Sequence, residues 1–331
     1  MSSLERTITP PRRWWKVFGK RGGRSYFVLT ALLPLLSYML LWEVLPIIWT
    51  LCLSFFDYSP SRSGGVILGF GGTNPYIGLE HFRRMMGNSL QAQLFRTSLI
   101  NTLMFAFIAV PLNLLITIPL AVAIESVHER FKGFFRFIYF LPTVTTSVAV
   151  AAMWKYLYHP QQGLFNIILK GVGLQPVIWL GDPRATLGGV PVALWAVILA
   201  SVWHDMGYNL IILIAALQAI PETFKEAARI DGASEWRVFW HITLPLLRPA
   251  IVSASTLTMM YFFHAFDIIQ IMTDGGPSNQ TQVLVLDIYQ NAFRSGRMGW
   301  AGAEAFILFL IVLLVTLLQL RLARKEWHYD T

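Results

Sequence analysis

Residues 220–250 read IPETFKEAARIDGASEWRVFWHITLPLLRPA and separate two long apolar stretches, at 192–217 and 249–272. A bilayer core about 30 Å thick requires about 20 mostly apolar residues per helix. Each of the two stretches is long enough to cross it. The segment between them therefore predicts a short polar connection that joins two membrane-spanning helices at one face of the membrane.

The connection itself predicts a helix–turn–helix. Pro221 suits the first turn of a helix, and Glu222 stands where the helix dipole favours a carboxylate. Gly232 follows, and glycine readily adopts the left-handed conformation that ends a helix. Ser234 can cap a second helix, which runs to a break at Pro245 and Pro249. An interfacial amphipathic loop is the plain alternative for such a segment.

Four further stretches have the length and composition of a span. The six expected spans lie near residues 26–55, 98–124, 134–157, 192–217, 249–272 and 301–322. The chain has 331 residues, of which 55% are hydrophobic and 13% charged. Soluble proteins carry about 25% charged residues, so this composition excludes a soluble enzyme domain. A single cysteine excludes a disulfide framework. We therefore expect an all-α membrane protein.

The basic residues are distributed unevenly among the connections. Of 26 Lys and Arg, 17 fall in the N-terminal segment, the second-to-third and fourth-to-fifth connections and the tail, and eight fall in the opposite connections. The positive-inside rule then places both termini in the cytoplasm. The net charge of +8 reflects this topology and contact with anionic lipid. We expect no nucleic-acid partner, because no reading motif accompanies the charge.

The polar connection carries a specific resemblance. The string EAARIDGAS, followed by LPLLRP, closely resembles the Glu-Ala-Ala…Gly signature of permeases of binding-protein-dependent ABC importers. In that family this loop is the cytoplasmic coupling helix, seated in a groove of the ATPase subunit. The resemblance implies a type I ABC importer permease fold with six spans. It assigns ATPase coupling to Glu226, Ala227, Ala228, Asp231, Gly232 and Ala233.

The resemblance extends over residues 27–323, nearly the whole chain. Residues 136–166 resemble the third helix and outer turn of the family, and residues 203–221 resemble the fourth helix. The turn Gly275-Gly276-Pro277 looks like that of the first of the two permeases in carbohydrate importers of the maltose and glycerol-3-phosphate type. Because the chain lacks the extra helices and outer domain of the maltose permease, we expect the layout of smaller members.

No G-x-x-x-x-G-K-[ST] loop is present, so we expect no ATP site, no cofactor and no enzymatic activity in this chain. The resemblance implies two ATP-binding subunits that hold ATP and Mg, a second homologous permease, an extracytoplasmic solute-binding protein and a bacterial or archaeal inner membrane. The expected organisation is a basic cytoplasmic segment at 1–25, a permease domain at 26–323 containing the coupling loop 221–248, and a cytoplasmic tail at 324–331.

A translocation path through lipid needs polar or aromatic groups at membrane depth, where such groups are otherwise costly. The third, fourth and fifth spans supply them. The candidate path residues are Tyr139, Thr143, Ser201, His204, Asp205, Tyr208, Thr258, Tyr261 and Phe262. Structural hydrogen bonds between helices are the alternative for the polar ones. A neutral di- or oligosaccharide fits this mixture of rings and hydroxyls, whereas an acidic oligosaccharide or glycerol phosphate stays open.

Three other functions stay open at lower weight. A proton-coupled secondary transporter would rest on the pairs His204–Asp205 and His264–Asp267, but the internal repeats typical of such transporters are absent. A membrane-embedded enzyme would need a catalytic constellation on one face, and none is evident. A zinc site would need tighter ligand spacing than these histidines have.

Overall fold

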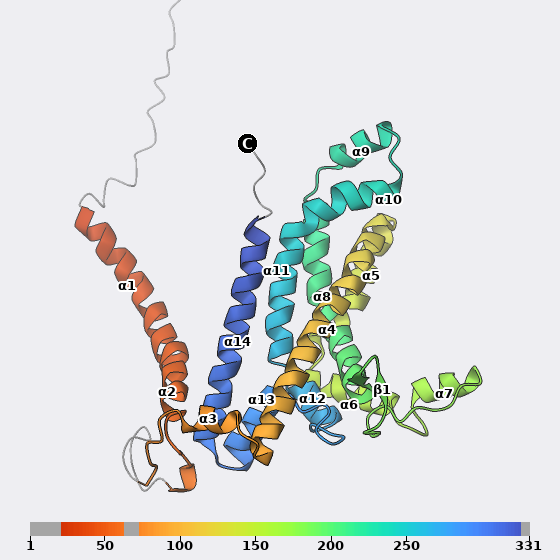
Figure 1. Ribbon diagram of the computed structural model, residues 1–331. Coiled ribbons are helices and arrows are strands. Elements are labelled where there is room, and N and C mark those ends of the chain that lie inside the picture. Colours follow the sequence, from red (N-terminus) through yellow and green to blue (C-terminus); the bar gives the residue numbers. More distant parts are fainter. Residues whose placement is uncertain (1–20, 63–72, 326–331) are drawn as a thin grey trace, which may run out of the picture. The chain divides into compact units, whose positions relative to one another are not determined.

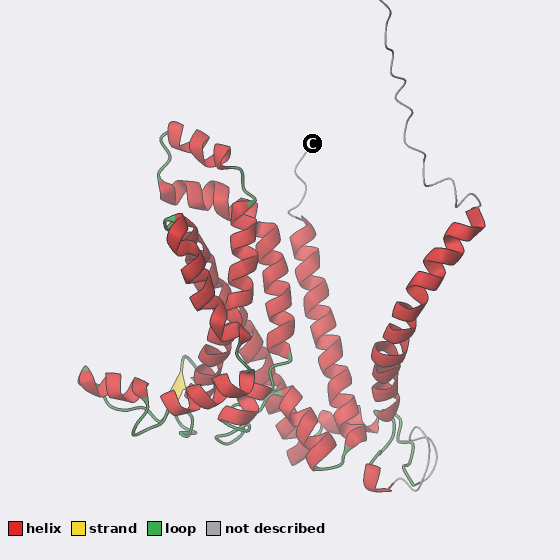
Figure 2. Ribbon diagram, turned by 180° about the vertical axis from the view of Figure 1, so that it is seen from behind, coloured by secondary structure: helices red, strands yellow, loops and turns green. Residues whose placement is uncertain are grey.

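The computed structural model describes residues 21–62 and 73–325, and these are almost entirely helical (Figures 1 and 2). The chain forms two compact units, divided after Cys52. The first unit contains α1 (Arg21–Met39), a π-helical turn η2 (Leu40–Val44) and α2 (Leu45–Leu53). Residues 1–20, which make up most of the expected basic segment 1–25, and residues 326–331 of the expected tail lie outside the described residues.

The first unit shows how one long apolar segment accommodates its prolines. Pro34 lies within α1, and the helix continues past it. Pro46 has no N–H to donate to the preceding turn of a regular helix. It is the second residue of α2, and the π-helical turn lies directly before that helix. At that turn the Leu45 N–H bonds to the Leu40 carbonyl, five residues back. The expected span therefore contains a local change in helix type.

The second unit is built around four long helices. These are α4 (Leu90–Ser126), α8 (Val192–Gln218), α11 (Leu244–Phe263) and α14 (Met298–Lys325). Among the candidate spans α8 has the largest buried share, and it packs against α4, α5 and α11. Phe105 of α4 meets Phe262 of α11 edge to face, with ring centroids 5.8 Å apart. The core therefore lies around α8.

Shorter elements complete the second unit. They are η3 (Pro60–Arg62), α3 (Glu80–Met85), α5 (Glu129–Val144), α6 (Ser147–Leu157), α7 (Leu164–Gly171), β1 (Thr186–Leu187), β2 (Val190–Pro191), α9 (Glu222–Ile230), α10 (Glu235–Val238), η5 (Phe239–Thr243), α12 (Asp267–Met272), α13 (Leu284–Tyr289) and η6 (Gln290–Arg294). In both views α9 and α10 lie at one end of the helices, and α6, α7, α12 and α13 lie at the other (Figures 1 and 2).

Within the described residues, five helices are long and apolar enough to cross a membrane, and the number is six if α5 and α6 count as one span. The third expected span bends by 97° between α5 and α6. The break does not fall at Pro142, which stays inside α5. It falls at Thr145, whose backbone is extended, and Thr146 caps α6 by accepting a bond from the Ala149 N–H.

The expected fifth span, 249–272, is also interrupted. Helix α11 ends at Phe263, and α12 begins only at Asp267. Phe266, the residue before α12, has φ −139° and ψ −63°, which no helix adopts. Ile268 and Ile269 of α12 are nevertheless buried in the core. Apolar composition alone therefore overestimated the length of this helix, because a short buried helix and a span have the same composition.

Candidate functional site

The end of α9 has the geometry that the sequence predicts. Gly232 has φ +81°, in the left-handed region. The Gly232 N–H bonds to the Arg229 carbonyl at 3.0 Å, and the Ala233 N–H bonds to the Ala228 carbonyl at 2.9 Å. These two bonds form a Schellman motif, which satisfies the last carbonyls of the helix. The expected stop at Gly232 is confirmed.

The second helix of the loop differs from the expectation in two respects. It begins at Glu235 directly after Ser234, but the Ser234 side chain makes no capping bond. It also does not break at Pro245 or at Pro249, which lies inside α11. Instead α10 passes through the π-helical turn η5 into α11, and Pro245 lies in the first turn of α11, where a missing N–H costs little.

Three ion pairs link charged side chains of the loop, and one of them joins α9 to α10. Glu222 accepts bonds from Lys225 at 2.9 Å and from Arg229 at 3.1 Å. Arg229 also binds Glu235 of α10 through two nitrogens, at 2.7 and 3.3 Å. The Lys225 bond, together with Arg229, lowers the pKa of Glu222, and the Glu235 bond, together with Glu222, raises that of Arg229. Arg229 therefore bridges the two helices of the loop.

The remaining side chains of α9 face outward. Ile230 is 86% exposed, and Phe224 and Ala227 are also exposed. These residues stand three apart, so they share one face of the helix. Glu226 is exposed beside them, and no described residue pairs with its carboxylate. The helix therefore presents an apolar strip and one acidic group.

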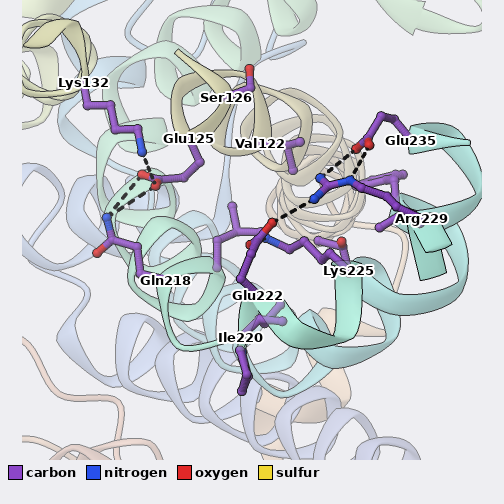
Figure 3. Close-up of a pocket in the computed structure, with 15 residues that line it drawn as sticks. Val122, Glu125, Ser126, Lys132, Gln218, Ile220, Glu222, Lys225, Arg229 and Glu235 are labelled. Carbon is purple, nitrogen blue, oxygen red and sulfur yellow. Dashed lines mark hydrogen bonds and ion pairs between the residues drawn. The ribbon is translucent and has the colours of Figure 1, made fainter. Parts of the chain in front are cut away.

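A cavity of about 740 Å³ lies between this loop and the ends of the long helices (Figure 3). Glu125, near the end of α4, faces it and accepts bonds from Lys132 at 3.3 Å and Arg136 at 2.5 Å, both on α5. Gln218, the last residue of α8, donates to the same carboxylate at 3.4 Å. One carboxylate therefore links α4, α5 and α8 at the end of the unit where the loop lies.

The middle of the second unit contains a buried polar cluster. Asp205 of α8 accepts bonds from Asn113 of α4 at 3.2 Å and Thr258 of α11 at 3.5 Å. Asn209 donates to Asn113 at 2.8 Å and to Thr258 at 2.6 Å. All four side chains are buried. This geometry matches the alternative interpretation, in which Asp205 and Thr258 form structural hydrogen bonds between helices.

His204 and Thr143 are also engaged by their own protein. The His204 Nε2–H donates to the Thr145 carbonyl at 3.0 Å, so its Nδ1 accepts from the Tyr261 hydroxyl at 3.2 Å. The Thr143 hydroxyl donates to the His204 carbonyl at 2.8 Å. These bonds connect α5 to α8 and α8 to α11.

The other path candidates fall into two groups. Phe262 is buried in the core, whereas Tyr208 and Tyr261 are exposed and Tyr139 is half-buried. Ser201 is buried, and its hydroxyl has no partner among the described residues. It lines a cavity of about 80 Å³ together with Tyr261, His264 and Asp267. The structure thus brings Ser201 and Tyr261 together.

Sequence reasoning missed several polar residues. Asn113 and Asn209 complete the buried cluster, and an amide within an apolar stretch was the available signal. Asp287 of α13 and Glu304 of α14 are also buried, and Asn291 donates to both carboxyl groups. Among the described residues no group of three or more His, Cys, Asp or Glu side chains has the arrangement of a metal site.

Residues 116–328 match the profile of one protein family, described as the binding-protein-dependent transport system inner membrane component. That match covers more than half of the chain. The chain belongs to this family. It is therefore an inner-membrane permease component of an ABC importer. This membership removes the basis for a proton-coupled secondary transporter and is consistent with a transport rather than an enzymatic role.

The permease is similar to curated proteins along most of their length. It is 33% identical to the trehalose/maltose transport system permease protein MalF of Thermococcus litoralis, over 88% of this chain and 92% of that protein. It is 33% identical to the sn-glycerol-3-phosphate transport system permease protein UgpA of Agrobacterium fabrum, over 78% of this chain and 85% of that protein.

A solved structure shares the fold of the permease. A chain of a bacterial ABC transporter involved in the import of the acidic polysaccharide alginate superposes with a TM-score of 0.75. The alignment covers 94% of this chain and 98% of that one, at 23% identity. The expected all-α importer permease fold is therefore confirmed, whereas the expected cytoplasmic position of both termini stays a prediction.

Proposed function

We propose that this permease is one of two homologous membrane subunits of an importer that moves a sugar into the cytoplasm by alternating access. An extracytoplasmic binding protein delivers the sugar, and two separate subunits bind ATP and Mg and hydrolyse the ATP. Family membership supports the class of transporter. The likeness to permeases named for trehalose/maltose and for glycerol-3-phosphate supports a small hydroxylated substrate.

The geometry of α9 carries the proposal. A short helix that exposes Phe224, Ala227 and Ile230 has an apolar strip suited to a groove in another protein. Glu226 adds a charge for a basic partner, and the small side chains of Ala227 and Ala228 permit close approach. Arg229 joins α9 to α10, which continues into α11. Movement of a docked ATPase subunit at α9 would thus reach the spans through α10.

We propose that the translocation path runs past those candidate residues that are exposed or lack a hydrogen-bond partner in the described part of the chain, and not past all nine. Ser201 and Tyr261 line one small cavity, and Tyr208 and Tyr139 offer further ring faces. Tyrosine faces and hydroxyl groups suit a sugar, whose CH groups stack and whose hydroxyls hydrogen-bond. A neutral di- or oligosaccharide fits best, and an acidic oligosaccharide or glycerol phosphate is the second candidate.

Substitutions at Gly232 test the coupling role. An added Cβ meets no atom within 4 Å, so the cost comes from the backbone and not from a clash. A left-handed conformation costs most residues about 1–2 kcal/mol, whereas asparagine tolerates it better. We expect Gly232→Asn to retain most transport and Gly232→Leu to lose it. The measurement is ATP hydrolysis stimulated by the loaded binding protein in liposomes.

Unchanged stimulation in Gly232→Leu would refute the coupling role of the loop. The transport class has a separate test: uptake that needs a proton gradient and no ATP would refute the importer. Substrate identity is best approached through the binding protein, by thermal-shift screening of neutral sugars, acidic oligosaccharides and glycerol phosphates. A stabilisation by glycerol phosphate alone would overturn the choice of a neutral sugar.

A further inference from the structure

The helical segment from α10 through α11 is longer than a span needs. It runs over Glu235–Phe263, 29 residues. At 1.5 Å per residue its length is about 43 Å, against about 30 Å for a hydrocarbon core. At its far end Phe262 and Phe263 are buried in the protein core. The excess therefore falls at the polar end, where α10 lies beside α9 (Figures 1 and 2).

This polar end carries two exposed stripes. Trp236 is 70% exposed and Trp240 is 45% exposed, with ring centroids 5.5 Å apart. Arg237 and His241 are exposed in the neighbouring stripe. Residues four apart share a helix face, so the aromatic and basic side chains run side by side along the segment.

The opposite face of the same segment packs inward. Val238 and Thr243 are buried, and both line the cavity between the loop and the long helices. The two tryptophans therefore point neither into the core nor into this cavity. Exposed tryptophans in pairs are unusual on a water-facing helix, and indole rings concentrate at the headgroup level of membranes.

Charge favours lipid as the partner of this surface. Residues 236–266 contain no Asp or Glu, whereas Arg237 lies in the first turn of the segment and His241 in the second. A basic stripe beside an aromatic stripe suits anionic headgroups, because the rings enter the acyl boundary while the basic side chains stay among the phosphates. The span α11, which follows η5 directly, also exposes apolar side chains, namely Leu246, Leu257 and Met260.

We propose that α10 and η5 form an interfacial anchor, in which Trp236 and Trp240 insert among the lipid headgroups on the side of the membrane where α9 lies. The Arg229–Glu235 pair joins α9 to this anchor. The membrane surface thus fixes the distance between the loop and the bilayer. The uptake rate should then depend on the lipid composition. The anchor requires only that the chain spans a membrane, and it is independent of what α9 contacts.

Spin labels at single cysteines test the anchor in the complete transporter, in nanodiscs that contain anionic lipid. The single native cysteine is removed as Cys52→Ser, and a nitroxide is attached to Trp240→Cys. Leu187→Cys on the β1–β2 hairpin is the exposed control, and Ile230→Cys on α9 reports docking of the ATPase subunit. Collisions with oxygen report lipid, and collisions with a water-soluble nickel complex report solvent.

We expect the label at residue 240 to collide with oxygen and to lose most of the nickel collisions seen at residue 187. Nickel collisions equal to those at 187 would overturn the proposal in favour of a solvated surface. Loss of both kinds of collision would overturn it in favour of a covering protein subunit. The label at 230 tests the coupling role separately, because ATPase docking should remove its nickel collisions whatever happens at 240.

Three further variants test the anchor if Trp240→Cys does not fold. A label at Arg237→Cys probes the neighbouring stripe without removing a ring. Trp240→Tyr retains an interfacial aromatic group, whereas Trp240→Glu opposes anionic lipid. We expect Trp240→Tyr to keep the wild-type uptake rate and Trp240→Glu to lose uptake progressively as the anionic lipid fraction rises. Equal uptake by both variants at every lipid composition would contradict the anchor.

Discussion

A single guanidinium organises the loop at the end of the second unit. Arg229 is the last basic residue of α9, and it reaches back to Glu222 and forward to Glu235. The planar guanidinium binds a carboxylate through two nitrogens, a geometry that lysine lacks. Because Gly232 turns the chain between the two carboxylates, the pair and the turn together define the angle between α9 and α10.

Arg229 variants should therefore change coupling more than stability. Exposed ion pairs contribute little net stability, so we expect Arg229→Ala to unfold at nearly the wild-type temperature. Its ratio of sugar uptake to ATP hydrolysis should fall, because α9 no longer moves as one body with α10. Arg229→Lys should be intermediate. The measurement is this ratio in proteoliposomes.

The exposed Arg184, in the connection between α7 and β1, provides a control of the same chemistry, and Arg184→Ala should leave the ratio unchanged. The exchange of charges in Arg229→Glu with Glu235→Arg should restore part of the lost coupling. An Arg229→Ala transporter with the wild-type ratio would show that the bridge has no part in coupling.

The elements themselves are joined by close packing between α5 and α8. Gly207 lies where α8 crosses α5, and an added Cβ would overlap the Thr143 hydroxyl. That Cβ would also lie 3.0 Å from the Tyr139 carbonyl oxygen and 3.1 Å from the Phe140 Cα. Small residues permit such an approach between membrane helices. This contact holds the Thr143 hydroxyl against the His204 carbonyl.

Gly207→Ala should therefore destabilise the permease although alanine favours helix. We expect a loss of about 1–3 kcal/mol, the usual cost of overpacking a fitted contact. Gly133→Ala on α5 is a matched control, because its added Cβ meets nothing within 4 Å. The control should be neutral or stabilising by up to about 1 kcal/mol. Thermal unfolding in detergent measures both, and equal shifts in the two variants would contradict the packing argument.

Element boundaries were only partly predictable from residue patterns. The glycine stop of α9 followed from local conformation, because only glycine adopts φ +81° without strain. The 97° bend between α5 and α6 and the break between α11 and α12 did not follow. Both lie within continuous apolar runs, where a buried short helix and a span look alike. Contacts with other helices decide between them.

At the scale of the whole molecule, orientation in the membrane is the main expectation still to be measured. The uneven distribution of Lys and Arg places α9 on the cytoplasmic side and the β1–β2 hairpin outside. In a Cys52→Ser background, Leu187→Cys should react with an impermeant maleimide in intact cells. Ile230→Cys should react only after lysis. The opposite pattern would reverse the topology and remove α9 from the compartment of the ATPase.

The amino-acid sequence by itself determined the membrane class, the family resemblance and the position of the loop that carries Glu226 and Gly232. These follow from composition, local backbone preference and a contiguous motif, all of which lie in neighbouring residues. Only the tertiary structure decided that Asp205 and Thr258 bind Asn113, and that Trp236 and Trp240 are left uncovered. A polar side chain in a span can bind substrate or can hydrogen-bond to another helix. Which of these applies depends on partners about 50 to 100 positions away in the chain, and only helix packing brings those partners within hydrogen-bond distance.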